Sequence, residues 1–283
     1  MSHIVEVVAY PSYSTLRTTV TSGVARVTLD NPPLNLLDAG LMTDLRDLVE
    51  RLREDGDVRV VVFDSADPEF FSAHGDGHFV TSPETFAAVA EGIPETTNPM
   101  QALHESIRRL PQVTIGKIAG FARGGGHELL LSMDMRFAAI GRAAVAQPES
   151  LLAIIPGGGG TQYLPRLAGR ARALEMVLGG ELLDAQLAER YGLVNRALPA
   201  AELDEFVDTL ADRIAGLAPG VIAGAKAAVD AALSGSYTDG LRVENDHLTR
   251  LFTPRAAERT VELFTRGFQT RDGERDLEAI LRA

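Results

Sequence analysis

Two apolar runs, Val58–Phe63 and Val113–Ile118, constrain the fold of this chain more than any other feature. Each run is bounded by charged or turn residues, which is typical of a parallel strand buried on both faces. Leucines at helical spacing precede the first run and predict a helix that begins after an N-cap at Asp38 and ends near Glu54. The stretch Val24–Leu29 predicts a further strand. Ser82-Pro83 and Asn98-Pro99 are each typical of an N-cap followed by proline, which predicts two helices between about 83 and 110. Parallel strands need crossover helices, so the sequence predicts a mixed α/β core.

The pattern changes after Ile155, where helical spacing dominates. It predicts a strand at Leu193–Ala197 and helices over about 169–179, 184–190, 200–217, 219–234 and 238–251. We therefore expect a core over residues 1–200 and a helical C-terminal region over residues 201–283. The tail from Arg255 to Ala283 keeps apolar residues among many charges, and we expect it to pack on a neighbouring subunit.

Composition excludes several classes of function. The chain has no cysteine, which rules out thiol nucleophiles, cysteine zinc clusters and disulfides. A net charge of −12 disfavours nucleic acid as a partner. We find no secretory leader and no apolar stretch long enough to span a membrane, so we expect a cytoplasmic protein without a membrane partner.

The run Gly124-Gly125-Gly126-His127-Glu128 lies at a predicted strand-to-helix turn. It lacks the Lys-Ser/Thr of a phosphate loop and the glycine spacing of a dinucleotide fold, and Glu128 would repel a phosphate. Exposed N–H groups beside one carboxylate suit a carbonyl oxygen that becomes anionic only transiently. A purely structural tight turn remains an alternative.

A second carboxylate, Glu149, follows in Gln147-Pro148-Glu149. Its neighbours Pro148, Leu151 and Leu152 are apolar, which predicts a raised pKa in the range useful for proton transfer. Two carboxylates close in space can share a water, with one acting as base and the other as acid. Taken singly, Glu128 is most typical of a helix first turn, and Glu149 is more typical of a cap or a surface group.

The loop over residues 70–76 follows the first buried strand. Ligands of open α/β folds gather at the carboxyl ends of parallel strands, so this loop and the glycine turn should lie on the same edge. Each could supply one backbone N–H to an oxyanion hole. Without the glycine turn, a simple polar loop would be the better interpretation.

Five motifs in register resemble the crotonase, or enoyl-CoA hydratase/isomerase, superfamily over about residues 16–235. They are Leu29-Asp30-Asn31-Pro32-Pro33-Leu34-Asn35, Phe71-Ser72-Ala73-His74-Gly75-Asp76, Gly120-Phe121-Ala122-Arg123-Gly124-Gly125-Gly126-His127-Glu128-Leu129, Gln147-Pro148-Glu149 and Ile155-Pro156-Gly157-Gly158-Gly159-Gly160-Thr161-Gln162-Tyr163-Leu164-Pro165-Arg166. The resemblance implies a spiral of ββα units and a helical C-terminal region that assembles trimers, often paired into hexamers. It also implies an acyl-CoA thioester as substrate, with no metal and no cofactor beyond the coenzyme A that the substrate carries.

Carried over by position, the resemblance makes the N–H groups of Gly75 and Gly125 the oxyanion-hole donors. Glu128 and Glu149 match the two catalytic glutamates that hydratases keep. Glu128 would assist attack of water at the β-carbon, and Glu149 would exchange the proton at the α-carbon. The resemblance also implies a set of substrate-binding residues along the path of the CoA moiety: Pro33, Leu34, Ala73, His74 and Asp76.

The chain departs from the family pattern around His74. The usual Ala-Gly-Ala-Asp loop is Ala73-His74-Gly75-Asp76 here, and the basic residue common shortly after it is absent. His74 could narrow the acyl pocket, take part in proton transfer or point to solvent. One residue is also inserted within 140–142, between the two glutamates.

Three functions therefore remain open from the sequence. Hydration of a 2-enoyl-CoA is favoured because both glutamates are present. Double-bond isomerisation, or another enolate reaction of the same fold, can run with a single carboxylate. A catalytically silent acyl-CoA binder is the third, suggested by His74 and the missing basic residue.

Overall fold

The computed structural model describes residues 10–282 and divides into two compact units, the first ending at Gly216 and the second beginning at Leu217. Residues 1–9 of the predicted core and Ala283 of the predicted tail lie outside the described residues. The predicted division into a core over residues 1–200 and a helical region over residues 201–283 stays a prediction.

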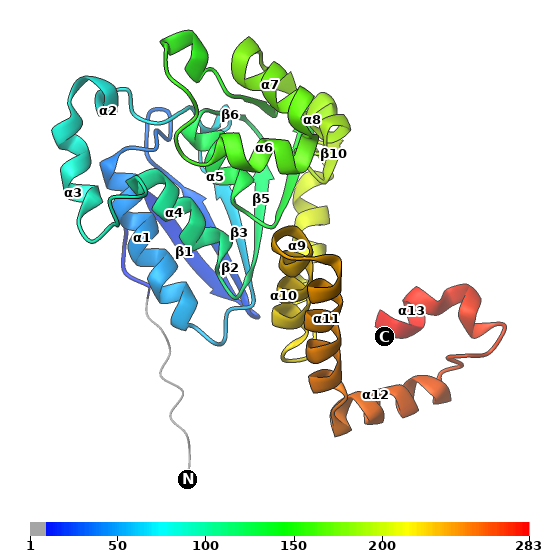
Figure 1. The fold of residues 1–283 in the computed structure, drawn as a ribbon. Helices are drawn as coiled ribbons and strands as arrows, with labels where there is room; N and C mark the ends of the chain where they lie inside the picture. Colours follow the sequence, from blue (N-terminus) through cyan, green and yellow to red (C-terminus); the bar gives the residue numbers. More distant parts are fainter. Residues whose placement is uncertain (1–9, 283) are drawn as a thin grey trace. The chain divides into compact units, whose positions relative to one another are not determined.

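The first unit is built on a main sheet in the order β1-β2-β3-β5-β7-β10 (Figure 1). β1 and β2 form an antiparallel pair, and all the other neighbours in this sheet are parallel. The strands at 24–29 and 113–118 match the prediction, and the apolar run at 58–63 supplies most of β3. The bounds are β1 (Leu16–Thr21), β2 (Val24–Leu29), β3 (Val60–Ser65), β5 (Val113–Ile118), β7 (Met135–Ile140) and β10 (Arg196–Pro199).

A second, smaller sheet has the strand order β4-β6-β8-β9, in which β4, β6 and β8 follow the same sequence order as β3, β5 and β7 of the main sheet. Each of β3, β5 and β7 is followed by one of its short strands, so the chain winds through successive ββα units, as the family resemblance implies. The sequence did not predict β4 or β6, because three residues carry too little pattern. The bounds are β4 (Phe70–Ser72), β6 (Phe121–Arg123), β8 (Ala144–Ala146) and β9 (Leu183–Asp184).

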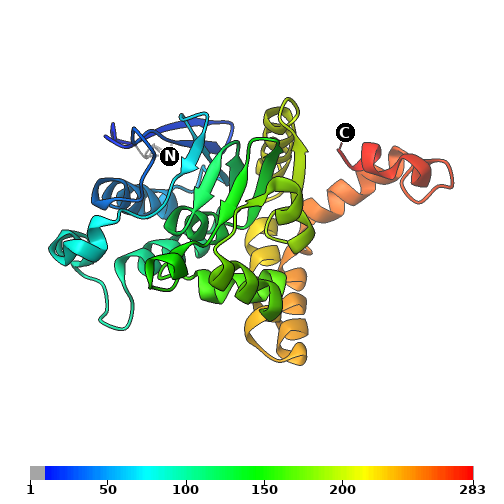
Figure 2. The same cartoon turned by 90° about the horizontal axis from the view of Figure 1, so that it is seen from above.

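Helices bury an apolar face on the main sheet. Asp38 caps α1 by accepting from the Leu41 N–H at 2.8 Å, as predicted. α1 and α4 lie side by side (Figure 1, Figure 2). The helices of this unit are α1 (Ala39–Glu54), α2 (His78–Thr81), α3 (Ala87–Ala90), α4 (Pro99–Arg108), α5 (Gly125–Leu131), α6 (Gly160–Ala168), α7 (Arg170–Gly179), α8 (Ala185–Tyr191) and α9 (Leu203–Ala215), with 3-10 turns η1 (Pro83–Phe86) and η2 (Glu149–Leu152).

The two helices predicted between 83 and 110 have different outcomes. Asn98 begins α4 with a complete capping box, in which it and Gln101 exchange side-chain-to-backbone hydrogen bonds. Ser82 makes no capping hydrogen bond, and the chain after it forms only the 3-10 turn η1 and the single turn α3. The prediction of a full helix from Ser82 is therefore wrong, because the Ser-Pro pair lacks the cap that would start one.

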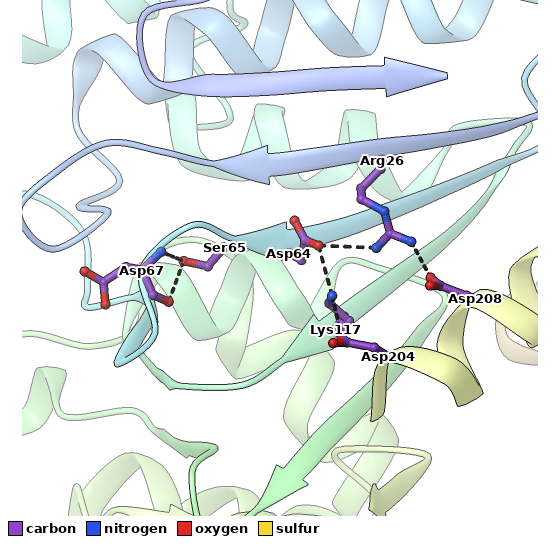
Figure 3. A network of polar contacts seen from close by, with 7 residues as sticks. All are labelled: Arg26, Asp64, Ser65, Asp67, Lys117, Asp204 and Asp208. Atoms are coloured by element: carbon purple, nitrogen blue, oxygen red, sulfur yellow. Dashed lines mark hydrogen bonds and ion pairs between the residues drawn. The ribbon is translucent and has the colours of Figure 1, made fainter. Parts of the chain in front are cut away.

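The helix α9 is fastened to the sheet by an ion-pair cluster, drawn in Figure 3. The cluster consists of Arg26, Asp64, Lys117, Asp204 and Asp208. Lys117 Nζ lies 3.1 Å from Asp64 Oδ2 and 2.7 Å from Asp204 Oδ1, while Arg26 pairs with Asp64 and Asp208. Strands β2, β3 and β5 supply the first three members and α9 supplies the last two, so the cluster joins elements far apart in sequence.

The second unit is helical throughout its regular structure, as expected for the C-terminal region. The helices α10 and α11 pack against each other, with Gly224 of α10 facing His247 and Leu251 of α11. No helix within residues 10–282 is both long and apolar enough to cross a membrane. The bounds are α10 (Val221–Ser234), α11 (Tyr237–Leu251), α12 (Pro254–Thr265), η3 (Gly273–Asp276) and α13 (Leu277–Arg282).

Candidate active site

Glu128 lies in the first turns of α5 and is almost completely buried. Its Oε1 accepts two backbone hydrogen bonds, from the Gly158 N–H at 2.8 Å and the Gly160 N–H at 2.7 Å. Loss of solvation raises the pKa of Glu128, and the two N–H donors oppose that rise. The carboxylate is thus held through one oxygen, which leaves Oε2 free of these donors.

Three consecutive positions of the loop that supplies those donors favour glycine. A Cβ on Gly158 would lie 2.7 Å from Glu128 Oε2, and one on Gly160 would lie 2.9 Å from Glu128 Oε1. Gly159 has a φ of 112°, which side chains rarely adopt. The sequence marks this glycine run but gives no sign that its N–H groups bind Glu128, because backbone donors leave no side-chain signature.

Glu149 begins the 3-10 turn η2 and is 8 % exposed. Loss of solvation, opposed by its own backbone N–H and helped by the charge of Glu128, raises its pKa to about 7. The raised pKa agrees with the expectation from its apolar neighbours. The effect of Glu128 also indicates that the two carboxylates are close enough to interact.

Gln147 connects Glu149 to a buried histidine. With its amide oriented so that both ends meet suitable partners, it donates to the two Glu149 oxygens at 3.1 and 3.2 Å and accepts from His127 Nδ1 at 3.1 Å. Burial lowers the pKa of His127 to about 3, so its ring is neutral. The sequence includes both residues in its motifs without predicting this chain of contacts.

The glycine turn lies against Glu149 and His74. A Cβ on Gly124 would lie 2.9 Å from Glu149 Oε1 and 3.8 Å from the His74 Cβ. The His74 ring is exposed, and its Nδ1 lies 2.7 Å from the Gly75 carbonyl oxygen, to which it can donate. His74 thus lies at the edge of the candidate site, with its Nε2 unused by these contacts.

Gly75 and Gly125, the predicted oxyanion-hole donors, are neighbours. A Cβ on Gly125 would lie 3.3 Å from Gly75 N and 3.1 Å from Met100 Sδ. Gly125 begins α5, where N–H groups have no intrahelical acceptor. Among residues 10–282, neither N–H is taken by a backbone or side-chain acceptor. Two free donors therefore lie side by side, near Gly124 and the Glu149 carboxylate.

The residues predicted to line the CoA path lie in two segments that a backbone hydrogen bond joins. The Ala73 N–H donates to the Leu34 carbonyl at 3.0 Å, and Ala73 is buried while Pro33 is exposed. Asp76 Oδ1 accepts from the His78 N–H at 2.9 Å and lies 2.8 Å from His78 Nδ1. Within the described part of the chain, no three His, Asp or Glu side chains come together as a metal-binding group.

Comparisons with known proteins identify the family of this chain. The family described as enoyl-CoA hydratase/isomerase has a sequence model that matches residues 19–269. A probable mitochondrial enoyl-CoA hydratase of Dictyostelium discoideum is 32% identical over 238 residues, which are 83% of this chain and 82% of the relative.

Solved structures extend the similarity to the fold. The crystal structure of a candidate enoyl-CoA hydratase from Streptomyces avermitilis is 46% identical, has a TM-score of 0.75, and the match covers 96% of this chain and 98% of that one. An enoyl-CoA hydratase from Bacillus anthracis is 29% identical with a TM-score of 0.80, covering 90% of this chain and 97% of its own. The chain is a crotonase-superfamily enzyme and belongs to the enoyl-CoA hydratase/isomerase family.

Proposed function

We propose that this enzyme adds water across the 2,3 double bond of an enoyl-CoA thioester. The observation that carries the proposal is the carboxylate pair, in which burial and Glu128 raise the pKa of Glu149 to about 7. A carboxyl group with that pKa is present in both protonation states near neutral pH, as a proton donor and acceptor must be. Names of relatives such as the Bacillus anthracis enoyl-CoA hydratase support the same reaction.

The two free N–H groups of Gly75 and Gly125 would hold the thioester oxygen. As water adds to the β-carbon, the C2–C3 π electrons move toward the carbonyl and the oxygen becomes an enolate. Donors fixed in advance stabilise that charge without reorganising. The two N–H groups are adjacent, and neither has an acceptor in the part of the chain that the structure describes, which supports this role.

Glu128 and Glu149 would divide the proton transfers between them. Ionised Glu128 takes a proton from the attacking water as the new C–O bond forms at the β-carbon. Protonated Glu149 gives its proton to the α-carbon, and the enolate collapses to the 3-hydroxyacyl-CoA. A proton then returns from Glu128 to Glu149, directly or through solvent, so the enzyme is unchanged and one water is consumed.

Pro33, Leu34, Ala73, His74 and Asp76 would line the path of the CoA moiety. The enzyme would need no metal or separate cofactor, because coenzyme A arrives with the substrate. We propose that it acts in the cytoplasm as a homotrimer or as a pair of trimers.

The test is loss of the enoyl absorbance band of crotonyl-CoA. Wild type should remove the band, and Glu149→Gln should retain acyl-CoA binding while losing most of the rate. Equal rates for the two proteins would refute the role of Glu149. Binding of acyl-CoA without turnover at any chain length would favour a silent binder, and conversion of a 3-enoyl-CoA alone would favour an isomerase.

A further inference from the structure

We propose that His104 is a positioning residue for Glu128, acting through the glycine loop over residues 157–160. The inference rests on the proposed function for its catalytic consequence, and on the geometry for the contacts themselves. His104 lies on α4 and does not touch Glu128 through a hydrogen bond. Its contact is with the loop that does.

Within the described residues, the His104 side chain makes one hydrogen bond, and that bond is to the loop. The ring is completely buried, and its Nδ1 lies 2.7 Å from the Gly158 carbonyl oxygen. A carbonyl can only accept, so Nδ1 carries the proton. Burial lowers the pKa of His104 to about 4, which keeps the ring neutral, and Nε2 has no partner among the described residues.

A second side chain holds the peptide unit on the other side of Gly158. Asn98 Nδ2 donates to the Gly157 carbonyl at 2.7 Å. That carbonyl and the Gly158 N–H belong to the same peptide unit, and the N–H is one of the two donors to Glu128. The two peptide units that flank Gly158 are therefore both fixed from α4 and its N-cap residue.

Such anchors matter because a run of glycines has no preferred conformation of its own. Glycine accepts far more backbone conformations than other residues, so four in sequence do not by themselves direct two N–H groups at one carboxylate oxygen. Hydrogen bonds in a chain also polarise one another, so Asn98 strengthens the Gly158 N–H as a donor. His104 and Asn98 together select the loop conformation that holds Glu128.

Loss of the anchor has a defined chemical effect. The Gly158 and Gly160 N–H groups lower the pKa of Glu128 against the effect of burial. A looser loop would let that pKa rise further, so more of Glu128 would be protonated and unable to accept a proton from water. The ionisable groups that face Glu128 are Glu149, Tyr163 and His104, and Glu105 beside His104 accepts from the Tyr163 hydroxyl.

The test compares two substitutions that differ only in the hydrogen-bond donor. His104→Leu removes the donor, whereas His104→Asn places an amide N–H near the position of Nδ1. The Leu variant should lower kcat for crotonyl-CoA by about 10- to 100-fold and move the acid limb of the pH profile to higher pH, with KM nearly unchanged. The Asn variant should recover most of the rate and return the limb toward wild type.

Two further variants separate positioning from stability. Asn98→Ser keeps a capping oxygen for α4 but loses the donor to Gly157, so it should move the acid limb in the same direction as His104→Leu. Ile107→Val trims a buried side chain on the same helix without touching the loop, so it should lower the melting temperature and leave the limb in place. If His104→Leu does not fold, the Asn98→Ser result decides the question.

Hydrogen–deuterium exchange gives a readout that needs no substrate. Peptides covering residues 157–160 should exchange faster in His104→Leu than in wild type, and at nearly the wild-type rate in His104→Asn. Unchanged exchange together with an unmoved acid limb would overturn the inference and leave the proposed function standing. If His104→Leu exchanges faster but the wild-type enzyme hydrates no enoyl-CoA, the proposed function is refuted and the positioning role stands.

Discussion

The ion-pair cluster and the carboxylate pair, both in the first unit, differ in how burial and neighbouring charges change the pKa of their members. In the ion-pair cluster of Figure 3, burial lowers the pKa of Lys117, but the hydrogen bonds and charges of Asp204 and Asp64 have a larger opposite effect, so the pKa is raised. In the carboxylate pair, burial raises the pKa of Glu128 and Glu149 instead. Among residues 10–282, neither of these carboxylates has a Lys, Arg or His ion-pair partner within reach.

The difference separates a structural use of charge from a chemical one. Opposite charges that meet keep both groups ionised, so the cluster can fasten α9 to the sheet but cannot exchange protons near neutral pH. Like charges that meet in a dry site raise the affinity for a proton. The carboxylate pair gains reactivity at the cost of the stabilisation that a cation would give.

The largest expected effect comes from removing one carboxylate. Glu149→Gln should lower kcat for crotonyl-CoA hydration by about 10²–10⁴-fold, because the amide cannot donate a proton to the α-carbon as the acid does. The absorbance assay measures this loss. Asp204→Asn, which removes a carboxylate from the ion-pair cluster, is the matched control and should leave kcat unchanged.

The oxyanion donors provide the next largest effect. Gly125→Ala adds a Cβ that would lie 3.3 Å from Gly75 N and 3.1 Å from Met100 Sδ, so we expect the Gly75 N–H to shift by a few tenths of an ångström from its place beside the Gly125 N–H. We expect kcat to fall by about 10²- to 10³-fold. Stopped-flow absorbance on crotonyl-CoA measures the change, and a kcat within twofold of wild type would show that these N–H groups do not hold the thioester oxygen.

The ion-pair cluster should show the opposite phenotype. Lys117→Met removes a cation that serves both Asp64 and Asp204 and leaves Asp64 largely buried. The free energy of unfolding should drop by about 1–3 kcal/mol, less than for a fully buried pair because Asp204 is exposed. Urea unfolding measures the drop. A large loss of kcat in the folded variant would break the division between the two regions.

The smallest effect is a pH-dependent gain in stability. Because folding raises the pKa of Glu149 to about 7, its contribution to stability is present below its unfolded pKa and is lost as pH rises through 7. After allowance for solvent screening, the free energy of unfolding of Glu149→Gln should exceed that of wild type by about 1–2 kcal/mol near pH 9. Near pH 4 the two proteins should show no such difference. Urea midpoints at the two pH values test the sign.

The elements predicted well are those whose pattern is local and repeated. The leucines of α1 recur at helical spacing after a capping Asp38, and the run at Val113–Ile118 supplies buried apolar side chains from Val113, Ile115 and Ile118. β4 and β6 have three residues each and form only because β6 pairs between β4 and β8. Pairing between short strands that are far apart in the sequence leaves no local pattern, so the smaller sheet could not be predicted from the sequence.

The candidate site divides in the same way. Glu128 and Glu149 stand out because each is a carboxylate in an apolar setting near a turn. The donors of Gly158 and Gly160 lack any side chain that would mark them, and His104 reaches Gly158 across 54 residues of sequence. These contacts depend on how α4 packs against the loop, and that packing cannot be predicted from the sequence.

The most direct test of the central claim is a pH titration of the glutamate carboxyl carbons by 13C NMR. Comparison of wild type with Glu149→Gln identifies the Glu149 signal. We predict a midpoint at about 7 for Glu149, absent from the variant. A midpoint near the ordinary value of about 4.3 would contradict the account, because Glu149 would then have no proton to give at neutral pH.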